Sequence, residues 1–102
     1  MTLEEFNRSI ATDAVPPDGL GLAVQSLWWD AKGDWEKAHR LAQEDPNPNA
    51  TWVHAYLHRR EGDETNAAYW YAKAVKPMAT GPFSTERDHI VATLLADALA
   101  GA

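Results

Sequence analysis

Residues 53–71 read VHAYLHRREGDETNAAYWY, and residues 24–42, twenty-nine positions earlier, read VQSLWWDAKGDWEKAHRLA. The two stretches align at a Gly-Asp pair, which is Gly33-Asp34 in the first and Gly62-Asp63 in the second. Glycine adopts the left-handed conformation that ends many helices, and Asp is a preferred N-cap residue. We therefore expect each stretch to form two helices joined by a short turn, which is a helical hairpin repeated with a period of 29 residues.

Small residues occupy matching positions in the two stretches. Ser26 and Ala38 of the first correspond to Ala55 and Ala67 of the second. Because small side chains allow two helix backbones to approach closely, we expect these positions to lie where the helices of each hairpin cross.

The rest of the chain also favours helix. Between breaks that contain Pro, Gly and Asp, the segments are rich in Ala, Leu, Glu, Lys and Arg, and none alternates as a strand does. Thr2 and Glu5 form a capping-box pattern, and Asn49 is the expected N-cap of the fourth helix. Six helices are expected, at residues 3–12, 20–32, 35–44, 50–61, 64–75 and 85–100, the last of them closed by Gly101.

The predicted fold class is all-α. Two helical hairpins, at about residues 19–47 and 48–77, are expected to form an α-α superhelix, with the first and last helices as its N- and C-terminal caps. The last helix has the most apolar residues, and we expect it to pack against residues 64–75. A chain of 102 residues has the length of one domain, residues 1–102.

Composition disfavours several classes of function. Nine Lys and Arg against 15 Asp and Glu give a net charge of -6, which argues against nucleic-acid and anionic-membrane partners. The absence of Cys excludes disulfides, thiolate nucleophiles and Cys-based metal sites. The first residues lack a signal-peptide pattern, so a cytoplasmic location is expected. There is no G-x-S-x-G sequence or phosphate-binding loop, and we expect no enzyme activity, no catalytic residues and no cofactor.

The duplicated hairpin resembles degenerate tetratricopeptide repeats (TPR-like repeats) over roughly residues 19–77. The matching residues are Trp29, Gly33-Asp34-Trp35-Glu36 and Ala38 in the first unit, and Gly62-Asp63, Ala67, Tyr71 and Ala74 in the second. The period of 29 differs from the 34 residues of the family. Ala42 and His58 stand where the family has aromatic residues.

The resemblance implies a protein or peptide partner, bound in a concave groove that the first helix of each unit lines. In the second unit the groove residues would be Asn49, Trp52, Tyr56, Arg59 and Arg60. Arg binds carboxylates in a fork, and Trp and Tyr supply rigid apolar area. Two alternatives stay open. The arginines could form a solvated helix end near Glu61 and Glu64. Surplus aromatic rings, as in Tyr69-Trp70-Tyr71 and Trp28-Trp29, could serve contacts in a homodimer.

The alternative function is binding of a small molecule or a divalent metal at His54 and His58. These residues are four apart, so their rings share one helix face, and Glu61 could be a third ligand. Residue 55 is Ala, so the H-E-x-x-H pattern of metalloproteases is absent. We favour a structural role, in which Trp70 and Tyr71 of the paired helix stack on the two rings.

Overall fold

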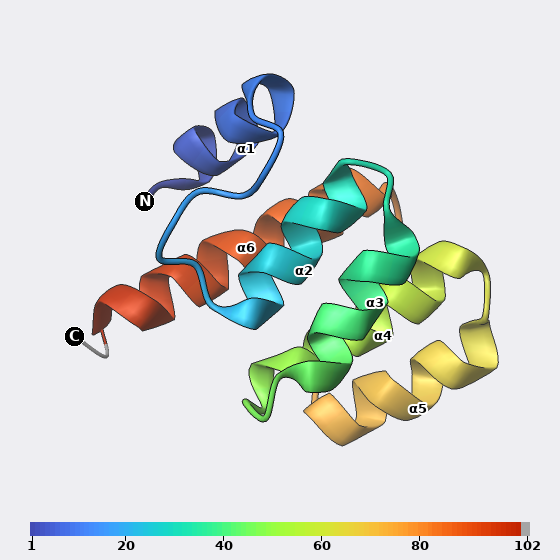
Figure 1. The fold of residues 1–102 in the computed structure, drawn as a ribbon. Helices are drawn as coiled ribbons and strands as arrows, with labels where there is room; N and C mark the ends of the chain where they lie inside the picture. Colours follow the sequence, from blue (N-terminus) through green and yellow to red (C-terminus); the bar gives the residue numbers. More distant parts are fainter. Residues whose placement is uncertain (101–102) are drawn as a thin grey trace.

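The structure is a computed structural model that describes residues 1–100, and within that range it contains six α-helices and no strand (Figure 1). The all-α prediction is confirmed. The helices are α1 (Leu3–Thr12), α2 (Leu22–Ala31), α3 (Trp35–Glu44), α4 (Asn49–Glu61), α5 (Glu64–Ala74) and α6 (Phe83–Ala100). The expected bounds differ most at the beginnings of α2 and α6, by two residues each. Gly101, the expected end of the last helix, lies outside the described residues.

The two Gly-Asp turns have the same geometry, as predicted. Gly33 and Gly62 are left-handed, with φ of 91° and 92°. The amide of the following Asp donates to a carbonyl five residues back, as in a Schellman cap. Asp34 then accepts the Lys37 amide at 3.1 Å, and Asp63 accepts the Asn66 amide at 3.2 Å, so each Asp caps the next helix.

The caps of the other helices confirm one prediction and correct another. Thr2 and Glu5 exchange both hydrogen bonds of a capping box at the start of α1. The prediction that Asn49 is an N-cap is wrong, since Asn49 is the first residue of α4 and Pro48 is the N-cap. The side chain of Asn47 supplies the acceptor there, for the Asn49 amide at 2.9 Å.

Each expected hairpin is a pair of packed helices, α2 with α3 and α4 with α5. Ser26, Ala38, Ala55 and Ala67 are all fully buried, as their small size predicted. Ser26 Oγ also donates to the carbonyl oxygen of Ala38 at 2.6 Å, which ties α2 to α3 at their crossing.

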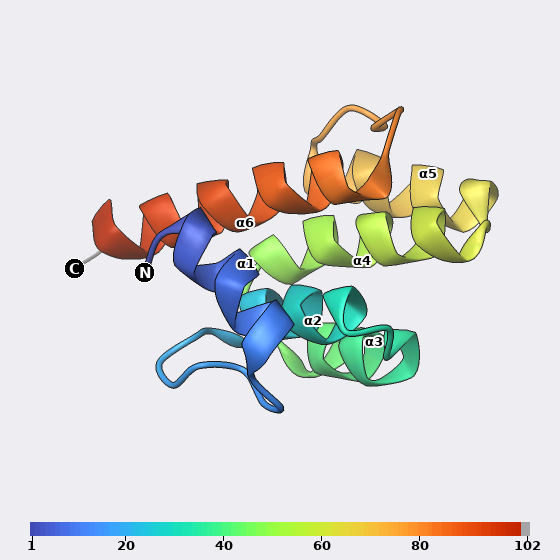
Figure 2. The same ribbon diagram turned by 90° about the horizontal axis from the view of Figure 1, so that it is seen from above.

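Helix α6 packs across α1, α2 and α4 (Figure 2). The prediction that it packs against residues 64–75 is wrong, because α5 meets it through a side-chain hydrogen bond from Tyr71 to Glu86 rather than by packing of the two helices. The reason is the size of the available apolar faces. Helices α2 and α4 contain four and six buried apolar residues, whereas α5 contains two.

One continuous core joins all six helices. It includes Phe6 of α1, Leu27 and Trp28 of α2, Ala38 of α3, Tyr56 and Leu57 of α4, Tyr71 of α5, and Ile90 and Val91 of α6. The radius of gyration, 12.6 Å, is close to the roughly 13 Å expected of a 100-residue domain. Within the described range, no helix is both long enough and apolar enough to cross a membrane.

Candidate functional site

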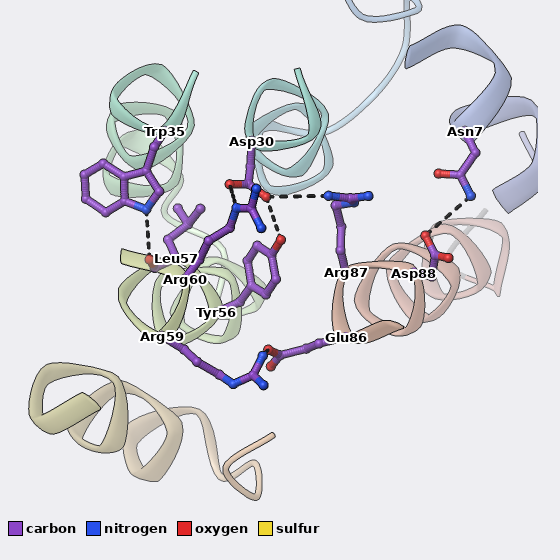
Figure 3. Close-up of polar contacts among 10 residues, drawn as sticks. All are labelled: Asn7, Asp30, Trp35, Tyr56, Leu57, Arg59, Arg60, Glu86, Arg87 and Asp88. Atoms are coloured by element: carbon purple, nitrogen blue, oxygen red, sulfur yellow. Dashed lines mark hydrogen bonds and ion pairs between the residues drawn. The ribbon is translucent and has the colours of Figure 1, made fainter. Parts of the chain in front are cut away.

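Three of the five predicted partner-binding residues form hydrogen bonds or ion pairs with side chains of α2 or α6 in the same chain (Figure 3). Tyr56 is fully buried, and its hydroxyl donates to Asp30 Oδ2 at 2.6 Å. Arg60 Nε pairs with Asp30 Oδ1 at 2.9 Å, and Arg59 Nη1 pairs with Glu86 Oε1 at 3.0 Å. The groups expected to face a partner therefore face the protein's own helices.

Asp30 of α2 and Glu86 of α6 are the two buried carboxylates that these α4 residues contact, and they are 1% and 7% exposed. Arg87 of α6 approaches Asp30 Oδ2 at 3.9 Å, so Asp30 joins α2, α4 and α6. Burial and the adjacent carboxylate, Asp30 for Tyr56 and Glu86 for Tyr71, raise the pKa of both phenols. Both hydroxyls stay protonated and act as donors, which is what an acceptor-only carboxylate needs in a buried position.

Arg59 also holds the loop between α5 and α6. Its Nη2 donates to the carbonyl oxygen of Gly81 at 2.6 Å, and its guanidinium lies 4.7 Å from the ring centroid of Phe83. The side chain is 12% exposed. Arg59 therefore fixes both the end of this loop and the beginning of α6.

Trp52 lies at the cavity that this loop encloses. The cavity measures about 520 Å³, and its lining residues are Trp52, Lys76, Pro77, Met78, Ala79, Thr80, Thr85, Glu86 and His89. Lys76 Nζ lies 4.2 Å from the Trp52 ring centroid, and the His89 ring meets the indole edge-on at 5.6 Å. We call this feature the Trp52 cavity.

Asn49 lies apart from the Trp52 cavity. It lines a smaller cavity of about 250 Å³, together with Asp45, Leu94 and Asp97. The five predicted partner-binding residues are thus divided between the α6 interface, the Trp52 cavity and this second cavity.

The two predicted histidines lie against α5, where the sequence placed them, and a third joins them. The Trp70 ring centroid is 4.4 Å from that of His54 and 6.5 Å from that of His58. His39 of α3 lies 4.8 Å from His54 and 5.2 Å from His58, and it stacks on Trp35. Its repeat counterpart is Ala68, so the repeat gave no signal for His39. Tyr71, also expected here, donates to Glu86 instead.

His54 and His58 are buried members of this group, 7% and 8% exposed. Among the described residues, His54 Nε2 has no hydrogen-bond partner. Burial first, and then His39, His58 and Lys73, lower the pKa of His54 from 6.5 to about 4. Burial and His58 also lower the pKa of His39. Both rings are therefore neutral at pH 7, with one basic nitrogen each.

Glu61, the expected third ligand, contacts His58. Its Oε2 lies 2.8 Å from His58 Nδ1. Ligand atoms of His58, Glu61 and Asp63 lie within 4.8 Å of one another. Asp63 is already the N-cap of α5, and Glu61 is exposed, so this group has a structural role in the α4–α5 turn.

Comparison with protein-family models, with curated proteins and with solved structures finds no match to this chain. Its function is therefore argued from geometry and charge.

Proposed function

We propose that this chain is a non-catalytic helical binding protein that takes an acidic segment of a protein or peptide partner at the Trp52 cavity. The observation that carries the proposal is a cavity of about 520 Å³ that is lined by the Trp52 indole and by Lys76, whose ammonium lies 4.2 Å from that ring. Its volume suits a few side chains of a bound segment.

Charge decides which partner fits. The chain has a net charge of -6, yet Lys76 and His89 both line this cavity. The one acid in the lining, Glu86, is already bound by Arg59 and Tyr71. A carboxylate of a partner would therefore meet a local cation without a competing free acid in the lining, and complementary charge of this kind gives specificity and faster association.

The apolar part of the cavity favours a large side chain beside the acid. Met78 is 47% exposed, and its flexible thioether adapts to the shape of a ligand. Trp52 is 7% exposed and adds a rigid aromatic wall to the lining, and aromatic residues of this type often dominate binding energy in interfaces. An aromatic or branched aliphatic side chain next to Asp or Glu matches both features.

The loop favours a peptide over a small metabolite. Residues 76–80 form neither helix nor strand. Among the described residues, the amides of Met78 and Thr80 donate no hydrogen bond to another backbone group. Free amides beside a cavity can bind the carbonyl oxygens of an extended peptide, as in strand addition.

The resemblance to tetratricopeptide repeats remains part of this proposal, supported by two identical Gly-Asp turns 29 residues apart. On this view, Trp52 contacts the partner directly, whereas Tyr56, Arg59 and Arg60 position α6 and the loop. We propose a cytoplasmic location for this activity, and a second copy of the chain is the competing partner.

Selection of random dodecamer peptides on the immobilised protein tests the proposal. We expect enriched peptides to place Asp or Glu beside a large apolar residue. Their affinity should fall about tenfold or more in Lys76→Glu, since the charge that attracts the acid is reversed, and it should weaken with added salt. Arg59→Ala should also weaken binding, because it removes the hydrogen bond from Arg59 to the Gly81 carbonyl oxygen that holds the loop in place.

Lys37→Glu is the matched control, because Lys37 also lies over an indole, 3.9 Å from the ring of Trp29, but outside the cavity. It should bind the selected peptides as the wild type does. Selection of no consensus, or of peptides that bind Lys76→Glu equally well, would overturn the proposal. Sedimentation measures the oligomeric state of each variant. If Lys76→Glu binds the peptides more weakly only because the variant self-associates, the proposal would also be overturned.

A further inference from the structure

The histidine cluster, made of His39, His54 and His58, lies on α3 and α4, away from the residues that line the Trp52 cavity. The three ring centroids are 4.8, 5.2 and 5.7 Å apart. From this geometry we infer a second binding site, in which these three imidazoles hold one divalent transition-metal ion of the Zn²⁺ class.

The spacing of the rings suits such an ion. In a tetrahedral site, zinc–nitrogen bonds of about 2.0–2.1 Å put the centroids of two coordinated imidazoles about 5 Å apart. The observed separations lie on both sides of that value. Coordination still requires rotation of the rings, because no choice of one nitrogen from each histidine places all three within 4.8 Å of one another.

His54 supplies an independent observation that points to a ligand. Its Nε2 is buried and has no hydrogen-bond partner in the part of the chain that the structure describes, and such groups are rare because each one costs free energy. A metal bond to this nitrogen would satisfy it.

Glu61 is placed to orient one of the ligands. A bond from His58 Nδ1–H to Glu61 Oε2, at 2.8 Å, leaves the lone pair of Nε2 free for a metal. The same carboxylate, which also acts on His39, would offset part of the positive charge of the ion. Carboxylate–histidine pairs of this kind are a regular feature of zinc sites.

The surroundings give the ion an entry path and a rigid wall. His39 is half-buried, and a cavity of about 170 Å³ reaches His54 and Trp70 from the surface. Trp35 stacks on His39 with an interplanar angle of 9°, and Trp70 lies against His54. Three neutral nitrogen ligands favour Zn²⁺, Ni²⁺ or Cu²⁺ over Mg²⁺ and Ca²⁺, which prefer oxygen.

The test is calorimetric titration of Zn²⁺ into tag-free protein from which metal has been removed with a chelator. We expect one ion per chain, no heat with Mg²⁺, and with Co²⁺ the intense visible bands of tetrahedral coordination. His39→Ala, His58→Gln and His54→Phe should each weaken zinc binding about tenfold or more. His54→Phe keeps a ring against Trp70, and circular dichroism verifies that each variant is folded.

His89→Ala is the matched control, because His89 is exposed, lies on α6 and belongs to the Trp52 cavity. It should bind Zn²⁺ within twofold of the wild type. Absence of zinc binding by the folded wild type would overturn the inference, as would a folded His39→Ala variant of unchanged affinity.

Glu61→Gln with Asp63→Asn separates this site from the carboxylate group in the α4–α5 turn, because Asn keeps the helix cap. If that pair abolishes binding while His39→Ala and His54→Phe do not, the three-histidine site is wrong. Peptide affinity at the Trp52 cavity is a separate readout, so either proposal can fail without the other.

Discussion

At the scale of single residues, the helix ends are the best understood part of this protein. Within residues 1–100, three helix C-termini have a left-handed residue, and two of these residues are Gly33 and Gly62. The third is Val75, with φ of 57°. A β-branched side chain is strained in that conformation, so Val75 shapes the loop of the Trp52 cavity at some cost in stability.

Val75→Gly should therefore stabilise the protein. The left-handed conformation costs an L-residue about 1–2 kcal/mol, and the extra freedom of glycine in the unfolded chain offsets about 0.5–1 kcal/mol of the gain. Little packing is lost, because Val75 is 88% exposed. We expect the free energy of unfolding in urea to rise by up to about 1 kcal/mol.

Val15→Gly is the control for this prediction. Val15 is also exposed, at 64%, but its φ is not positive. The same substitution there should leave stability unchanged or lower it. A Val75→Gly variant less stable than the wild type would contradict the strain argument.

At the scale of the elements, the sequence predicted where helices lie better than it predicted what they contact. The Gly-Asp turns and the small residues at the crossings depend on neighbours within one hairpin, and both were found as expected. The place of α6 depends instead on which helices offer the largest apolar faces, and these are α2 and α4.

Two leucines of α6 test this packing by the same substitution. Leu94 is 5% exposed and contributes to the core, whereas Leu99 is 70% exposed. Leu94→Ala should lower the free energy of unfolding by about 2–5 kcal/mol through the cavity that it leaves. Leu99→Ala should change it by less than about 0.5 kcal/mol.

Chemical denaturation followed by circular dichroism measures both effects. Because both variants change Leu to Ala on one helix, intrinsic helix propensity cancels in the comparison. Equal losses of stability would mean that α6 does not pack as described.

At the scale of the whole molecule, the shared core decides how the protein unfolds. All six helices contribute to one apolar cluster, and Asp30 and Glu86 bond residues from different helices. An array of weakly coupled hairpins would instead unfold unit by unit. The arrangement predicts a single cooperative transition.

Tryptophan fluorescence and far-ultraviolet circular dichroism test this prediction. The five Trp residues all lie on α2, α3, α4 and α5, so fluorescence reports on the hairpins, whereas circular dichroism also reports on α1 and α6. We expect the two urea midpoints to coincide. Helicity lost before fluorescence changes would show that α6 detaches independently.

For the candidate sites too, the sequence predicted residues that are neighbours on one helix better than residues that meet from different helices or loops. Sequence reasoning named Trp52, His54 and His58, which lie close together on one helix. It missed Lys76 and His39, because each meets its partner from another element. It also assigned Arg59 to a partner, although Arg59 binds Glu86 of α6, 27 residues further along the chain.

By itself, the sequence determined the helices, their turns and the two repeated hairpins, because caps and left-handed turns involve residues within about five positions of one another. Only the tertiary structure decided that α6 covers the predicted groove, that Trp52 opens to a cavity beside Lys76, and that three histidines meet. These contacts depend on burial and packing between residues distant in the chain, and burial alone is nearly non-directional, so local sequence patterns do not specify its partners.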